Sequence, residues 1–372
     1  MTRSSKKIFI VAGETSGDIH GAKLMEALKQ QSPEIQFMGH GGDLMKAQGL
    51  HLLEHVDSLS MMGFSEVIKH LPYMMRVMKN TISAIETERP DRIILIDYPG
   101  FNLRLAKRIS KLGIPVTYFI LPQVWAWKEK RVNVLRQFVD QYISIFPFEQ
   151  DWFKKRNLTI DYVGHPFVER SITHDQIMDF YNRHNLSEEH PRLILLPGSR
   201  QQEIDRHWPI FMQTVHEVRI SVPELQVILG KAPGVELNPI PDFIHVETVD
   251  IPAAIQSSTA ALASSGTVTL EAAVLDTPVA VCYKLSAMSW FLLNRFVKVP
   301  FASMANLIAG QKIVPEYLQN AMRPHEIAAE LIPLLSHTAQ RKKMLLGFET
   351  IRRSLGTPGV YNRAATLILN RL

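Results

Sequence analysis

The sequence predicts an α/β protein made of two domains, each built on a doubly wound, mostly parallel sheet, with a central cleft between them. Short apolar runs alternate with amphipathic stretches along the chain, which is the order of a βαβ fold. Three apolar runs end abruptly in turns rich in Gly and Ser, at residues 13–18, 197–200 and 264–267. Ligands of open α/β sheets bind at the carboxyl ends of strands, so these turns indicate one cleft.

The first half contains six predicted strands, each a short apolar run. They lie at residues 8–13, 35–41, 92–97, 116–121, 142–146 and 160–164. Amphipathic stretches at residues 18–31, 102–112 and 128–138 predict helices, and a further short helix ends near Gly49. A polar stretch follows the Gly-His-Pro turn at residues 164–166, so the first domain is predicted to span residues 1–165.

The second half repeats this scheme. Its predicted strands lie at residues 193–197, 224–229, 243–247, 260–264 and 278–283. This domain is expected to span residues 166–344, and a helical tail at residues 345–372 is expected to pack back on the first domain. A chain of 372 residues is long enough to give each domain its own core.

Composition and charge narrow the classes of partner. A net charge of +5 favours anionic ligands or an anionic membrane surface without demanding nucleic acid. Cys282 is the single cysteine, which excludes an internal disulfide and fits a reducing compartment. The amino terminus resembles a first strand rather than a signal peptide. The longest uncharged stretch, residues 251–270, is too rich in Ser, Thr, Gly and Pro to be a usual bilayer span.

Two turns of the second half have the composition of phosphate sites. Gly198 allows close approach of the backbone to a ligand, Ser199 can cap the next helix, and Arg200 carries a fork of donors suited to a diphosphate. An ordinary strand–turn–helix connection with an exposed arginine is the alternative. A similar turn has successive backbone N–H groups that open a helix and form an anion site; its residues are Ser264, Ser265, Gly266 and Thr267.

Asp97 is the candidate for acid–base chemistry in the first half. It lies where the strand at residues 92–97 stops, and Pro99 prevents the strand from continuing, so the carboxylate is expected to face the cleft. Capping of the next helix is the structural alternative. His20 and His165 are alternative bases, although each also fits a structural or hinge role.

Residues 122–131 combine two tryptophans with three cations. Indole faces stack on sugars and acyl chains, so Trp125 is assigned to substrate binding, and the cations that follow Trp127 could meet phosphate. A helix with a solvated charged face, anchored in the core by its tryptophans, is the alternative.

Eight motifs together resemble the lipid-A-disaccharide synthase family. They occur in the family's order and are VAGETSGDIHGA, IDYPGFN, PQVWAWKEKR, FPFE, VGHPFVE, LLPGSRQQEI, SSGTVTLEAA and MANLIAG. The resemblance implies a GT-B glycosyltransferase that works with inversion and without a metal or other cofactor. It would join UDP-2,3-diacylglucosamine to 2,3-diacylglucosamine 1-phosphate through a β-1,6 bond and release UDP. It would be cytoplasmic and peripherally associated with the inner membrane of a Gram-negative cell.

The same resemblance assigns roles to residues of this sequence. Asp97 would be the general base on the acceptor 6-hydroxyl. The residues that would hold UDP are Arg200, Ser264, Ser265, Gly266, Thr267, Glu271 and Asn306, with Glu14, Ser16 and Gly17 across the cleft. The partners would be the two lipid substrates and an anionic membrane surface; a homodimer is left open.

An amphipathic segment at residues 61–78 is the candidate for membrane or acyl-chain contact. Its methionines adapt to varied apolar shapes, and cations lie among them. The residues assigned to this contact are Met61, Met62, Phe64, Val67, Ile68 and Leu71. Residues 285–301 are a second candidate, and packing of both segments on their own sheets is the alternative.

Three other functions are alternatives to the glycosyltransferase. A nicotinamide-dependent oxidoreductase is disfavoured because the first turn does not read G-x-G-x-x-G. A UDP-N-acetylglucosamine 2-epimerase shares the architecture but needs no second substrate. A non-catalytic, membrane-associated nucleotide-binding protein would need neither Asp97 nor three phosphate-type turns.

Overall fold

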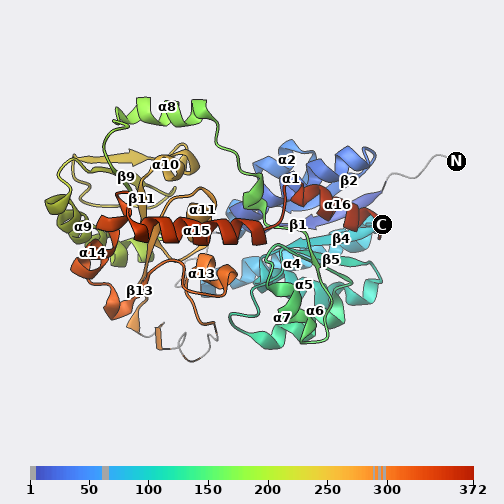
Figure 1. Cartoon of the computed structure of the whole chain (residues 1–372). Helices are drawn as coiled ribbons and strands as arrows, with labels where there is room; N and C mark the ends of the chain where they lie inside the picture. The colour runs from blue at the N-terminus through green and yellow to red at the C-terminus, as the bar shows by residue number, and fades with distance from the viewer. Residues whose placement is uncertain (1–5, 61–66, 288–289, 292–294, 296–298) are drawn as a thin grey trace. The chain divides into compact units, whose positions relative to one another are not determined.

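The computed structural model describes residues 6–60, 67–287, 290–291, 295 and 299–372, and the chain forms two compact units (Figure 1). Unit 1 comprises Met1–Pro166 and Thr357–Leu372, and unit 2 comprises Phe167–Gly356. The main boundary thus lies one residue beyond the predicted one. The predicted tail is divided, because residues 345–356 belong to unit 2 and only the last sixteen residues return to unit 1.

Within the described residues, unit 1 has a parallel sheet of seven strands in the order β3-β2-β1-β4-β5-β6-β7. The strands are β1 (Lys7–Val11), β2 (Gln36–Gly41), β3 (Leu50–His55), β4 (Arg92–Ile96), β5 (Val116–Phe119), β6 (Gln141–Ser144) and β7 (Asp161–Tyr162). Strand β3 was not predicted. It is an edge strand whose side chains are mostly half-buried or exposed, so its sequence LHLLEH has no continuous apolar run.

The helices of unit 1 connect these strands. They are α1 (Thr15–Gln31), α2 (Asp43–Ala47), α3 (Val56–Ser60), α4 (Val67–Glu88), α5 (Pro99–Ile109), α6 (Val132–Phe138), α7 (Glu149–Lys154) and α16 (Val360–Leu369), with the 3-10 turns η1 (Ser110–Leu112) and η2 (Glu129–Arg131). Hydrogen bonds hold α16 on this unit: the Tyr361 hydroxyl lies 2.8 Å from His20 Nδ1, and Arg363 Nη2 donates to the Val163 carbonyl at 2.7 Å.

Unit 2 has, in its described part, a parallel sheet of six strands in the order β10-β9-β8-β11-β12-β13. The strands are β8 (Arg192–Leu196), β9 (Gln226–Gly230), β10 (Ile244–Glu247), β11 (Ala260–Ser264), β12 (Val279–Tyr283) and β13 (Glu316–Leu318). The helices are α8 (His174–His184), α9 (Gln201–Ser221), α10 (Ile251–Ser257), α11 (Thr267–Val274), α13 (Met304–Ala309), α14 (Pro324–Leu334) and α15 (Ala339–Ser354), with the 3-10 turn η4 (Gln319–Ala321). The link between the units contains η3 (Pro166–Glu169).

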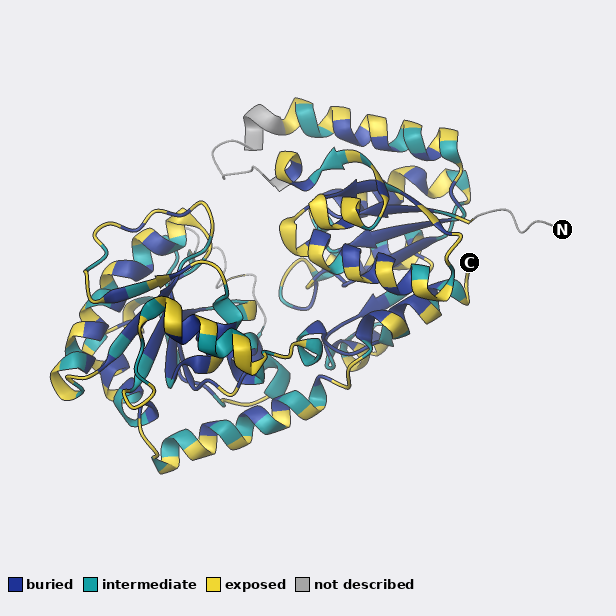
Figure 2. Cartoon of the chain, turned by 90° about the horizontal axis from the view of Figure 1, so that it is seen from above, coloured by how far each residue is buried: buried dark blue, intermediate teal, exposed yellow. Residues whose placement is uncertain are grey.

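Both sheets are buried on their two faces, and Figure 2 shows their strands mostly in the colour of buried residues. This burial explains the continuous apolar runs of the sequence, since strands covered by helices on both sides have no polar face. The strand order reverses between β1 and β4 in unit 1 and between β8 and β11 in unit 2. Doubly wound sheets bind ligands at such switch points, beyond the carboxyl ends of the strands.

Candidate active site

The switch point of unit 1 brings together the turns that follow β1 and β4. These strands are paired, with Val11 opposite Leu95, so Glu14 and Asp97 lie beyond neighbouring strand ends. The two turns pack so closely that a Cβ atom at Gly13 would overlap the Tyr98 ring. Asp97 and Tyr98 have φ values of 41° and 45°, a left-handed conformation that is uncommon for non-glycine residues and often occurs at functional sites.

Hydrogen bonds fix the backbone carbonyl of Asp97. Its carbonyl oxygen accepts from Tyr118 Oη at 2.6 Å and from Asn102 Nδ2 at 2.8 Å. The N-cap position of α5 belongs to Tyr98, and no side chain caps this helix, so Asp97 does not have the capping role that was the structural alternative.

The electrostatic surroundings of Asp97 suit a general base. Burial, and then the negative charge of Glu14, raise the pKa of Asp97 to about 7, against a smaller opposite effect of the Tyr98 backbone N–H. A base with a pKa near the working pH combines a useful ionised fraction with strength as a proton acceptor. Glu14 itself is exposed, as are Thr15 and Ser16 at the start of α1, whereas Gly17 is buried.

We expect kcat/KM to rise as the pH increases through about 7, because Asp97 loses its proton there and can act as a base. Glu14→Gln removes a negative charge that raises the pKa of Asp97, so it should move this midpoint to lower pH. The check is the pH profile of kcat/KM for wild type and variant. An unchanged midpoint would show that Glu14 does not act on the titrating group.

Trp125 has the core position that was the alternative to substrate binding in the sequence analysis. Its side chain is only 7% exposed, and its indole N–H donates to Glu149 Oε1 at 2.7 Å. The Ser144 hydroxyl contacts the other carboxyl oxygen. Burial is the main cause that raises the pKa of Glu149 to about 8, which favours the protonated carboxyl group. The indole therefore belongs to an interior network, which corrects the prediction that Trp125 stacks on a ligand. Trp127, 48% exposed, is the tryptophan at the surface.

In unit 2 the turn after β8 is shaped by Gly198. Its φ is 134°, and a Cβ atom there would lie 2.7 Å from Glu203 Oε2. Arg200, rather than Ser199, is the N-cap residue of α9, and no side chain caps the helix. The Arg200 side chain is 79% exposed and its guanidinium lies 3.6 Å from Glu203 Oε1, so it is available to an anion.

His207 supports this turn and was not singled out from the sequence. The side chain is fully buried, with Nδ1 2.7 Å from the Pro197 carbonyl oxygen. Nε2 accepts the backbone N–H of Lys284 at 2.9 Å, so the proton must be on Nδ1, which donates to Pro197. Burial lowers the pKa of His207, which favours this neutral form. The imidazole thus ties the phosphate-type turn to the end of β12.

The turn between β11 and α11 lies beside the first, because β8 and β11 are paired with Leu196 opposite Ala263. Ser264 is buried, and the Ser265 hydroxyl donates to the Ala302 carbonyl at 2.7 Å. Thr267 opens α11 and is exposed. The switch point of unit 2 therefore joins the predicted anion turns at residues 197–200 and 264–267.

Asn306, predicted to hold UDP, instead has a structural role. It is fully buried, its Nδ2 donates to Val314 O and Glu316 Oε1, and its Oδ1 accepts the N–H groups of Ile313 and Val314. These four bonds use the amide's donors and acceptors, so no side-chain polar atom is left for a ligand. Glu316 also accepts the backbone N–H of Ala302 at 2.9 Å, so this network helps to position the residue that Ser265 contacts.

Asn306→Ala should lower the free energy of unfolding by about 2–4 kcal/mol, because two buried N–H groups lose their acceptor. Denaturant titration measures this loss, and calorimetry measures the affinity for UDP at a temperature where the variant is folded. Unchanged stability combined with lost UDP affinity would instead make Asn306 a ligand contact.

Glu271 lies on α11 and forms an ion pair with Arg170 of the same unit. Its predicted contact with UDP therefore involves a carboxylate already held by a guanidinium. The two alternative bases have other surroundings: His20 meets Tyr361, and His165 is buried beside Phe146, with ring centroids 5.4 Å apart.

The predicted membrane segment is described only in part. Met61, Met62 and Phe64 lie outside the described residues, and Val67 and Ile68 are described only as part of the helix α4. Leu71 and Met75, one turn apart, are 50% and 60% exposed. Among the described residues, no helix has both the length and the apolar composition to cross a bilayer.

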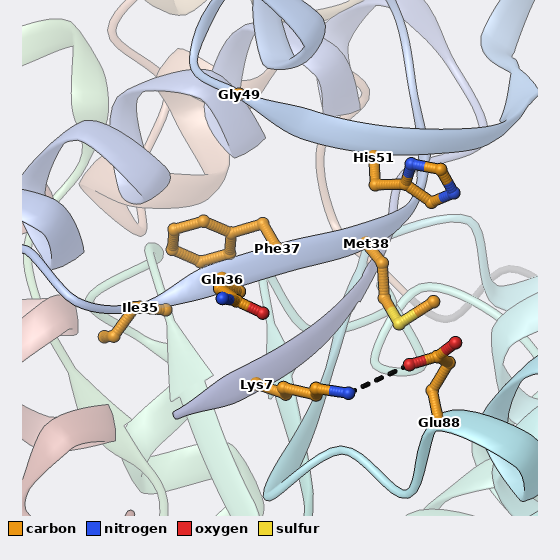
Figure 3. Close-up of a pocket in the computed structure, with 8 residues that line it drawn as sticks. All are labelled: Lys7, Ile35, Gln36, Phe37, Met38, Gly49, His51 and Glu88. Carbon is orange, nitrogen blue, oxygen red and sulfur yellow. Dashed lines mark hydrogen bonds and ion pairs between the residues drawn. The ribbon is translucent and has the colours of Figure 1, made fainter. Parts of the chain in front are cut away.

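A pocket of about 380 Å³ lies in unit 1 at the amino ends of the strands, at the other end of the sheet from Asp97 (Figure 3). Residues of β1 and β2 line this pocket, and so do Lys7 and Glu88, which form an ion pair at 3.0 Å. It is therefore separate from Asp97. Across the described ranges, no three His, Cys, Asp or Glu side chains are grouped to hold a metal ion, and independence from metals stays a prediction.

Solved structures define the fold class. The UDP-N-acetylglucosamine 2-epimerase from Neisseria meningitidis bound to UDP-GlcNAc has a TM-score of 0.67 at 12% identity, over 98% of this chain and 100% of its own. The calicheamicin glycosyltransferase has a TM-score of 0.61 at 14% identity, over 100% of this chain and 99% of its own. Such identities concern the fold alone, which is the GT-B fold of glycosyltransferases and epimerases.

Sequence comparison identifies the family. The profile of the family described as lipid-A-disaccharide synthetase matches residues 8–369. The lipid-A-disaccharide synthase of Myxococcus xanthus (strain DK1622) is 37% identical over 373 residues, covering 98% of this chain and 97% of the relative. That of Gluconobacter oxydans (strain 621H) is 36% identical over 366 residues, covering 96% and 88%. The chain belongs to the lipid-A-disaccharide synthase family, a family of glycosyltransferases.

Proposed function

We propose that this glycosyltransferase moves 2,3-diacylglucosamine from its UDP derivative to the 6-hydroxyl of 2,3-diacylglucosamine 1-phosphate, with inversion, and releases UDP. Family membership supports the reaction class. The observation that carries the mechanism is Asp97, a half-buried carboxylate at the switch point of unit 1 with a pKa of about 7.

In the proposed step, Asp97 takes the proton of the acceptor 6-hydroxyl. The oxygen of that hydroxyl attacks the anomeric carbon of the donor. The bond from that carbon to the diphosphate oxygen breaks, and UDP leaves with the bonding electrons. Arg200 and the backbone N–H groups at residues 265–267 would stabilise the negative charge that develops on the diphosphate. The exposed guanidinium and the braced turn of unit 2 support this assignment.

The test measures UDP release from UDP-2,3-diacylglucosamine with and without the phosphorylated acceptor. The proposal expects release only when the acceptor is present. UDP formation at the same rate without acceptor, or isomerisation of the donor alone, would refute it and would favour hydrolysis or epimerisation.

We further propose that the enzyme is cytoplasmic and docks on the inner-membrane surface through the first turns of α4, since both substrates carry acyl chains. Leu71 and Met75 offer exposed apolar side chains, and the exposed Arg76 adds a cation beside them. Apolar contact and attraction to anionic lipids act together in interfacial binding.

Leu71→Ser with Met75→Ser should reduce co-sedimentation with vesicles that contain phosphatidylglycerol. The melting temperature should change little, because both side chains are exposed. Ile220→Ser is the matched control, an exposed apolar residue on α9 of unit 2. Equal vesicle binding by wild type and the double variant would refute this docking surface.

A further inference from the structure

Two cations of unit 1 lie over an exposed tryptophan, and the charge of a third acts on both of them. Arg104 lies on α5, while Lys128 and Arg131 lie at the two ends of η2. Lys128 Nζ is 4.0 Å from the centroid of the Trp127 ring, and Arg131 Cζ is 5.6 Å from it. Cation–π contacts of this kind hold the side chains over the indole.

The cations of this cluster act on one another as like charges. Burial, and then the charges of Arg131 and Arg104, lower the pKa of Lys128; burial and the charge of Arg104 also lower the pKa of Arg131. In the described part of the chain, no carboxylate forms an ion pair with any of the three. The acid of the same turn, Glu129, accepts a hydrogen bond from Arg156 Nε at 2.8 Å. Three like charges held together without a counter-charge favour an anionic ligand.

The cluster lies near the candidate base. The Tyr118 hydroxyl donates to the Asp97 carbonyl at 2.6 Å. Burial, and then the negative charge of Asp97, raise the pKa of this tyrosine, while the positive charge of Arg131 opposes the rise. The Asp97 backbone thus contacts a phenol whose pKa is also affected by Arg131, and α5, the helix that carries Arg104, begins two residues after Asp97. In the acceptor sugar, the 1-phosphate and the carbon that bears the 6-hydroxymethyl group flank the ring oxygen, so one sugar ring can bring phosphate and hydroxyl to neighbouring protein groups.

We propose that Arg104, Lys128 and Arg131 form a subsite for the phosphomonoester of the acceptor, next to Asp97. This inference rests on the proposed function and adds the protein groups that select a phosphorylated acceptor. The guanidinium forks suit phosphate oxygens, and the ammonium adds a point charge. Binding the phosphate there orients the sugar so that its 6-hydroxyl meets the base.

The test compares wild type with Arg104→Gln/Arg131→Gln on two acceptors, 2,3-diacylglucosamine with and without its 1-phosphate, in neutral detergent micelles. The double variant should raise the KM for the phosphorylated acceptor by about tenfold or more, as expected for lost charge-assisted hydrogen bonds. It should leave the KM for the donor and for the unphosphorylated acceptor nearly unchanged. Lys111→Gln is the control, an exposed cation beyond the far end of α5. An equal effect on both acceptors, or none, would overturn the subsite.

Calorimetry in an Asp97→Asn background separates this subsite from the reaction itself. Weaker binding of the phosphorylated acceptor by the variant with the two glutamines would support the subsite. Absence of UDP release by wild type would refute the proposed function alone and would leave this support for the subsite in place. If the cations instead serve lipid headgroups, the double variant loses binding to phosphatidylglycerol vesicles and keeps its affinity for the micellar acceptor; that result contradicts the proposal. The melting temperature should not fall, because the substitutions remove repulsion between like charges.

Discussion

Asp97→Asn should lower kcat by about 10²–10⁴-fold, the usual effect of losing a general base. The amide has nearly the same shape and cannot take a proton. Asparagine also tolerates the left-handed backbone found at this position, whereas alanine would add strain that has nothing to do with the chemistry. The measurement is steady-state kinetics with calorimetry of UDP binding, which should be nearly unchanged. A variant that retained more than about half of the wild-type rate would return Asp97 to a structural role.

The same variant should be more stable than wild type at pH 8. Because burial raises the pKa of Asp97 to about 7, the folded protein keeps this proton while the unfolded chain, with an ordinary pKa near 4, loses it. Wild-type stability therefore falls as pH rises from about 4 to 7, and the loss remains at higher pH. Asparagine has no such penalty. Denaturant titrations at pH 8 and pH 4 should show a difference between the proteins that is larger at pH 8.

Arg200→Gln should weaken UDP binding by about 1.5–3 kcal/mol, or about 10–100-fold, and should also slow the reaction. The guanidinium is exposed, so its loss should leave the melting temperature unchanged. Arg206→Gln, a second arginine on α9, is the control and should keep its affinity. Calorimetry that shows the same UDP affinity for wild type and Arg200→Gln, together with an unchanged rate, would contradict the assignment.

The sequence predicted the parts of the fold whose signals are local. Strands such as β4 and β8 are buried on both faces and therefore appear as continuous apolar runs. Two edge strands, β3 and β13, give no such signal, because their side chains are mostly half-buried or exposed, and they were not predicted. The edge strands β7 and β10 were predicted. The strand-end turns could be recognised because glycine and serine mark them directly.

Side-chain roles set by distant partners could not be predicted. Trp125 is held by Glu149, 24 residues away, and the ring of His207 is oriented by Lys284, 77 residues away. Asn306 has the residue type of a ligand contact, and only the fold shows that its bonds go to residues 313–316. The high pKa of Asp97 likewise depends on the burial that the assembled sheet provides.

The product of the reaction tests the central claim most directly. Wild-type enzyme supplied with UDP-2,3-diacylglucosamine and 2,3-diacylglucosamine 1-phosphate would be followed by NMR of the sugar anomeric protons together with quantitation of UDP. We expect one UDP for each new glycosidic bond, with that bond in the β configuration at the 6-oxygen of the phosphorylated sugar. A product with retained configuration, or UDP formed without a new disaccharide, would contradict the account.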